Sequence, residues 1–138
     1  MVCFAAVFAS SPSFAATRKQ VIVPEEDRFS PFELTVRVGD SVTWQNSDTD
    51  DHTVVSLDSA NTTGPRRVDV LLRGTDNNGG KPGKHTIKFT QAGTFTYYCR
   101  FHAQLNDHRQ PIAPGPYGGI KDVNGNYGTP MMGIITVK

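Results

Sequence analysis

The sequence predicts an all-β protein, folded as a Greek-key β-sandwich of seven or eight strands. Short segments in which polar and apolar residues alternate recur along the chain, as in residues 33–38 and 41–45. Turn-forming residues separate these segments, and the chain contains 13 Gly and 9 Pro. No segment carries a helical periodicity longer than a turn or two. Short strands joined by frequent turns are typical of two-sheet sandwiches.

Each expected strand is a run of four to six residues that favours an extended backbone. Val42 and Trp44 share one face of their strand, and the large apolar surface of Trp indicates that this face is the core. A chain of 138 residues has room for one ordinary domain, which we place at residues 17–138. The strands are expected at residues 20–23, 33–38, 41–45, 52–56, 68–72, 84–89, 94–99 and 133–137.

Residues 1–16 have the pattern of an export signal. They carry no charge, and the apolar run from Val2 to Ala9 is followed by small residues that suit cleavage after Ala15 or Ala16. The alternative is a buried N-terminal strand. An apolar run of this length is too short to span a bilayer as a helix, so no transmembrane segment is expected. The sequence therefore predicts an exported protein, in the periplasm or another extracytoplasmic compartment.

Charge and cysteine content narrow the possible functions. The formal net charge is +1 and no run of Lys or Arg is present, so nucleic acid is not an expected partner. Removal of the signal would take Cys3 with it and leave Cys99 alone in an oxidising compartment. This cysteine could form an intermolecular disulfide, lie buried as an inert thiol, or bind a metal.

Residues 103–130 do not fit the strand pattern and are predicted to form a long loop insertion. They contain four Pro and five Gly, with no sustained alternation. Loops of more than about 12–15 residues without regular structure are uncommon in compact domains and are usually functional or disordered.

The candidate metal ligands stand at the ends of expected strands. His52 opens one strand, Cys99 and His102 flank the turn after another, and Met131 and Met132 precede the last. Two imidazoles, a thiolate and a weak thioether suit a trigonal copper site with a long axial bond to Met. Structural zinc would prefer four strong ligands, and a thioether is a poor fourth.

Two other histidines and an acidic turn are not expected to bind the metal. His85 is expected to be exposed on a polar strand face beside Lys84 and Lys88, and His108 is expected to be a loop residue. The turn with Asp48, Asp50 and Asp51 is expected to be solvated, with its negative charge near the metal end, where it could steer a basic partner.

Four segments, in order, resemble the type 1 copper proteins, the plastocyanin/azurin-like cupredoxins. The resemblance covers most of the chain from about Val21, and its segments are 32–44, 51–54, 92–102 and 131–137. It implies a cupredoxin-like domain with one copper ion held by His52, Cys99, His102 and Met131, with Met132 as the alternative axial ligand. The family usually has only a few residues between the second His and the Met, whereas residues 103–130 intervene here.

The resemblance further implies one-electron transfer between Cu(I) and Cu(II), with a redox partner protein and no catalysis. Two alternatives remain at this point. If the insertion displaced Met131, the open axial position could make a mononuclear copper enzyme or a small-molecule-binding site. The chain could also be a copper carrier, although carriers usually expose more Met and His than this sequence has.

Overall fold

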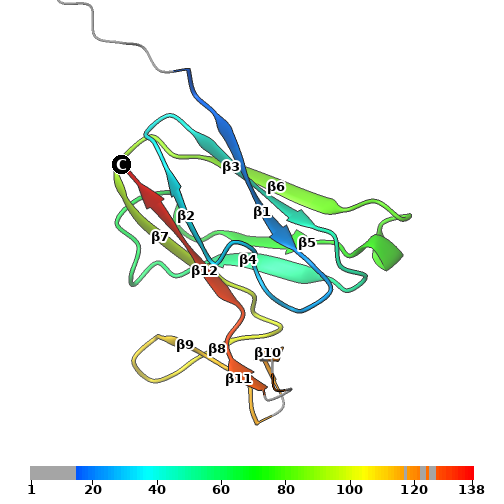
Figure 1. Cartoon of the computed structure of the whole chain (residues 1–138). Coiled ribbons are helices and arrows are strands. Elements are labelled where there is room, and N and C mark those ends of the chain that lie inside the picture. Colours follow the sequence, from blue (N-terminus) through cyan, green and yellow to red (C-terminus); the bar gives the residue numbers. More distant parts are fainter. Residues whose placement is uncertain (1–14, 117, 122–123, 125–126) are drawn as a thin grey trace, which may run out of the picture.

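Two β-sheets packed face to face form the body of the protein in the computed structural model (Figure 1). The structure describes residues 15–116, 118–121, 124 and 127–138, so residues 1–14 of the expected export signal lie outside it. The first sheet has the order β1-β3-β6, formed by Arg18–Val23, Ser41–Asn46 and Gly83–Lys88. Strand β1 is parallel to β3, and β3 is antiparallel to β6.

The second sheet has the order β2-β12-β7-β4-β5. Strand β12 is parallel to β2 and antiparallel to β7, and β4 is antiparallel to both β7 and β5. The prediction of an all-β sandwich is confirmed, and these two sheets hold eight strands in the described part of the chain. The strands are Glu33–Val36 (β2), Met132–Val137 (β12), Gly93–Tyr98 (β7), His52–Ser56 (β4) and Asp69–Leu72 (β5).

Helical structure in the described residues is limited to one 3-10 turn. This turn, η1, covers Thr75–Asn77 inside the Gly-rich connection between β5 and β6. No helical segment there has the length and hydropathy of a membrane-spanning helix.

Aromatic side chains from the two sheets meet in the core. Trp44 of β3 packs edge to face against Tyr97 of β7, with ring centroids 5.1 Å apart, and also against Phe95 at 6.3 Å. The alternation that predicted the strands places these residues on the inner faces. Burial of one Phe-sized side chain stabilises a fold by about 1.5–3 kcal/mol, so this cluster fixes how the sheets face each other.

The Tyr97 side chain of β7 lies over Gly133, its register partner in β12, because Gly133 has no side chain. A Cβ at Gly133 would lie 2.4 Å from the Tyr97 hydroxyl oxygen and 3.1 Å from the Phe32 carbonyl oxygen. The pairing of β12 with β7 brings Met132, the first residue of β12, opposite Tyr98, and Met131 immediately precedes the strand.

The segment 103–130, predicted as a long loop, contains four short strands in its described part. Gln104–Leu105 (β8) pairs with Pro111–Ile112 (β9), and Ile120–Lys121 (β10) pairs with Tyr127–Thr129 (β11). The Asn106 side-chain oxygen accepts hydrogen bonds from the backbone N–H groups of His108 and Gln110, which closes the first hairpin. Figure 1 shows both hairpins beyond one end of the sandwich, where β12 begins.

Candidate metal centre

Three of the predicted ligands converge at this end of the sandwich. His52 is the first residue of β4, Cys99 directly follows β7, and His102 lies in the turn after it. The Cys99 Sγ atom is 3.9 Å from His52 Nδ1 and 3.7 Å from His102 Nδ1. The two imidazole centroids are 5.0 Å apart. The ligand atoms of all three residues lie within 4.8 Å of one another.

These separations fit one metal ion. Metal–sulfur and metal–nitrogen bonds of about 2.3 and 2.0–2.1 Å at trigonal angles would place sulfur and nitrogen about 3.7 Å apart. The measured 3.7 and 3.9 Å agree with that value. A His2Cys set in trigonal arrangement is the donor set that blue copper sites use.

Met131 lies between the backbones of two of these ligands. Its carbonyl oxygen accepts a hydrogen bond from Cys99 N–H at 2.9 Å, and its N–H donates to the His102 carbonyl at 3.0 Å. The Met131 side chain is fully buried, whereas Met132 is half-buried and begins the strand face opposite. Of the two methionines, Met131 therefore faces the interior beside the cluster.

The Cys99 sulfur is buried and surrounded by hydrogen-bond donors. Thr53 donates to it from its backbone N–H at 3.3 Å and from its hydroxyl at 3.6 Å. Burial opposes ionisation of the thiol, but hydrogen bonds from His102, His52 and Thr53 lower the pKa of Cys99 to about 5. The thiolate, which is the form that binds metals, is thus favoured at neutral pH.

Carboxylates contact the outer nitrogens of both histidines. His52 Nε2 is hydrogen-bonded to Asp48 Oδ2 at 2.9 Å. The Asp27 Oδ1 atom lies 3.7 Å from His52 Nε2 and 3.5 Å from His102 Nε2. Burial works against protonation of His52, but its contacts with Cys99 and Asp48 raise its pKa above the ordinary value. The hydrogen bond to Cys99 raises the pKa of His102.

Asn46 organises the turn that presents His52. Its side-chain amide donates to the carbonyl oxygens of Asp50 and Leu72, and its side-chain oxygen accepts the N–H of Asp48. The expectation that the whole acidic turn is solvated was wrong for Asp48, which is buried because it bonds to His52.

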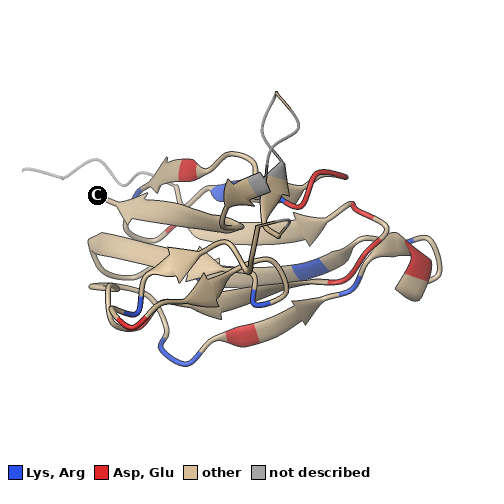
Figure 2. Ribbon diagram, turned by 90° about the horizontal axis from the view of Figure 1, so that it is seen from below, with Lys and Arg blue, Asp and Glu red and all other residues tan. Residues whose placement is uncertain are grey.

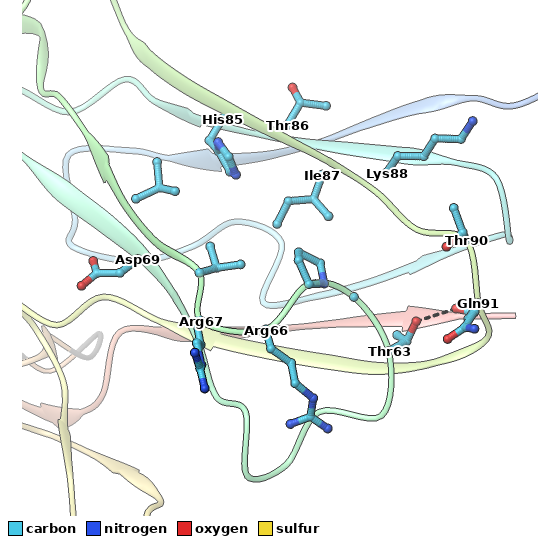
Figure 3. Close-up of a pocket in the computed structure, with 14 residues that line it drawn as sticks. Thr63, Arg66, Arg67, Asp69, His85, Thr86, Ile87, Lys88, Thr90 and Gln91 are labelled. Carbon is cyan, nitrogen blue, oxygen red and sulfur yellow. Dashed lines mark hydrogen bonds between the residues drawn. The ribbon is translucent and has the colours of Figure 1, made fainter.

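His85 lies away from this cluster and is half-buried, so it is less exposed than expected. Across β3 and β6 it is the register partner of Trp44, and it shares a strand face with Ile87. Figure 3 shows both side chains turned to the same side of β6, towards a cavity of about 700 Å³ that none of the predicted ligands lines. Burial lowers the pKa of His85. The neighbouring lysines suggested a polar face, but alternation places residue 85 with residue 87.

The remaining histidine, His108, is an exposed residue of the β8–β9 turn, and the described structure does not bring it to the cluster. Sequence reasoning missed Asp27, Asn46 and Thr53. The sequence could have indicated Asn46, since this residue ends an alternating strand and precedes a polar turn. Nothing in the sequence indicated Asp27, because only the folded loop between β1 and β2 brings it near the histidines.

Comparison with known proteins identifies the family of the chain. Residues 1–107 match the family model of the cupredoxin-like domain. A chloroplastic plastocyanin of Tetradesmus obliquus is 35% identical over 75 residues, which are 54% of this chain and 50% of the relative. This chain therefore spans half the length of that relative.

Solved structures show the same fold. A Cu(I) form of an amicyanin variant superimposes with a TM-score of 0.54 at 19% identity, covering 88% of this chain and 82% of the other. A purple cupredoxin from Nitrosopumilus maritimus gives a TM-score of 0.50 at 23% identity, with 87% and 99% covered. Because the family model matches more than half of this chain, the chain belongs to the cupredoxin family.

Proposed function

We propose that the protein is a one-electron carrier with a single copper ion held by His52, Cys99, His102 and Met131. The observation that carries this proposal is that the Nδ1 atoms of His52 and His102 lie near the buried Cys99 sulfur, at the distances expected of ligands in a trigonal metal site. Copper bound there would supply a Cu(II)/Cu(I) couple. The copper proteins found by structural comparison support the choice of metal.

The chain supplies a rigid frame for these ligands. His52 is fixed at the start of β4, Cys99 at the end of β7 and Met131 by two backbone hydrogen bonds. Ligands held by strands move little when a metal changes its charge, and this favours rapid electron transfer. The N–H of Thr53 directs a hydrogen bond at the Cys99 sulfur, and such bonds tune a metal site.

His102 is the proposed point of electron entry and exit. Its side chain is 25% exposed, whereas His52 and Cys99 are buried completely. We propose that a redox partner protein docks over His102 and that the chain acts as an electron carrier and not as an enzyme. We further propose that the mature chain starts after Ala15 or Ala16 and works outside the cytoplasm, where its one remaining cysteine is protected as a metal ligand.

The test is the visible absorption and paramagnetic resonance spectrum of the copper-loaded protein without residues 1–16. We expect an intense thiolate-to-copper band that disappears on reduction and returns on reoxidation. Cys99→Ser removes the thiolate and should abolish the band, whereas His108→Ala, in an exposed turn, should leave it unchanged. A wild-type protein that binds copper without this band would overturn the proposal.

A further inference from the structure

The carboxylate of Asp27 lies between the outer nitrogens of the two ligand histidines. One oxygen, Oδ1, is 3.5 Å from His102 Nε2 and 3.7 Å from His52 Nε2. Because the Nδ1 atom of each ring faces the Cys99 sulfur, each metal-binding imidazole would carry its proton on Nε2. Both N–H groups then point to acidic side chains.

The two histidines differ in the carboxylates that their Nε2–H groups contact. His52 has a buried partner of its own, since Asp48 Oδ2 is 2.9 Å from its Nε2. The one carboxylate recorded in contact with His102 in the described structure is that of Asp27. Figure 2 marks in red the acidic loop before β2 and the acidic turn before β4, from which these two residues come.

The loop that carries Asp27 is fixed at both ends. Ile22 and Ser30 form a pair of backbone hydrogen bonds, each of 2.8 Å, which closes the segment between them. Phe29 is buried and packs edge to face against Tyr97 at 4.8 Å. Asp27 adopts a left-handed backbone with φ of 49°, which Asp tolerates better than most residues. Its carboxylate is therefore held near the histidines by a structured loop.

The charge of Asp27 is not neutralised by a basic side chain among its recorded contacts. The adjacent Arg28 pairs with Glu26 through its Nε atom, and the ion-pair partners recorded for Asp27 in the described residues are the two imidazoles. Its side chain is 38% exposed, so solvent screens this charge only in part.

We propose that Asp27 is a positioning residue that orients the exposed ligand His102 through Nε2 and lowers the reduction potential of the site. This inference rests on the proposed copper function. A carboxylate that accepts the outer proton of a ligand imidazole fixes the ring and makes it more basic. Its negative charge also favours the more positive metal ion, so it stabilises Cu(II) over Cu(I).

The first test compares Asp27→Asn with Glu25→Gln by spectroelectrochemical titration. Asn keeps the size of the side chain and removes its charge, and the exposed Glu25 provides a matched loss of charge from the same loop. At the wild-type midpoint potential, Asp27→Asn should shift the Cu(II)/Cu(I) ratio about threefold or more towards Cu(I), as a partly screened nearby charge would. Glu25→Gln should shift it less, and Asp27→Glu should restore part of the wild-type value. Equal shifts in the Asp27 and Glu25 variants would overturn the inference.

A second measurement separates orientation from charge and needs no redox activity. In the zinc-loaded protein, nitrogen–proton correlation spectra should show a His102 Nε2–H signal that exchanges slowly with water. Asp27→Ala should make that exchange at least severalfold faster, while the His52 signal, held by Asp48, should change less. Unchanged His102 exchange would reject the positioning role. Because this spectrum does not depend on a thiolate-to-copper band, it distinguishes failure of the inference from failure of the proposed function.

Discussion

Met131 and Met132 are neighbours with the same chemistry, but their side chains lie on opposite faces of the extended chain. Residues 131, 133, 135 and 137 are buried and alternate with half-buried residues at 132, 134 and 136. Met131 also exchanges backbone hydrogen bonds with Cys99 and His102, so its position is coupled to both of these candidate ligands. Burial and alternation together favour Met131 as the axial ligand, although its chemistry is the same as that of Met132.

Replacing each methionine by Leu tests this assignment. The Met131→Leu change removes the thioether and should raise the midpoint potential by on the order of 59 mV, a tenfold change in a one-electron equilibrium. It should also alter the visible spectrum, because the axial contact helps to set the electronic structure. Such volume-conserving exchanges usually cost less than about 1.5 kcal/mol, so the fold should persist. Met132→Leu is the control. A larger effect at Met132 would reverse the assignment.

At the scale of elements, Asp40 ties the residue before β1 to the turn between β2 and β3. Its Oδ1 accepts the N–H of Thr17 at 2.7 Å, and its Oδ2 accepts the N–H of Arg37 at 2.9 Å. These hydrogen bonds lower the pKa of the Asp40 carboxyl below its ordinary value of 3.8, and the bond from Arg37 has the largest effect. The ionised form is therefore the one that stabilises the junction.

This pKa shift predicts a stability difference that depends on pH. A carboxyl whose pKa is lower in the folded state stabilises the protein above its unfolded pKa, and this contribution is lost as pH falls through the folded pKa. Asp40→Asn should lower the thermal unfolding midpoint at pH 7, and the difference from wild type should shrink at pH 3. The exposed Asp50→Asn variant serves as the control. A difference that stays constant or grows on acidification would contradict the assigned hydrogen bonds.

The strands also show which elements a sequence can reveal. Strands β3, β6, β7 and β12 each have six residues, enough for alternation to define an inner and an outer face. Strands β8, β9 and β10 have two residues each, too few to show a period, and so their segment was predicted as a loop. His52, Cys99 and His102 were predictable because their chemistry is unusual at strand ends. The position of Asp27 beside the histidines was not predictable, since it depends on the closure of the loop by Ile22 and Ser30.

At the scale of the whole molecule, the two ends of the segment 103–130 lie side by side. The carbonyl of His102 accepts the N–H of Met131 at 3.0 Å, so the residues that flank the segment are adjacent. The two hairpins extend from that point beyond the sandwich (Figure 1). The two sheets of the sandwich do not include these hairpins. Shortening the segment would remove no strand of the two sheets, although it would remove Ile120, which packs against the buried core.

We expect the segment to limit access to His102, whose side chain is 25% exposed. Replacing residues 104–129 by a Gly-Ser turn should leave the thiolate-to-copper band intact, since His52, Cys99, His102 and Met131 all remain. The rate of electron exchange with a small anionic iron complex should rise about tenfold, within the range over which association rates vary among related complexes. His108→Ala, which changes only the exposed hairpin turn, should leave the rate unchanged. Equal rates in the shortened and full-length proteins would show that the hairpins do not limit access to His102. Loss of the thiolate-to-copper band would show that the hairpins help to hold the ligands.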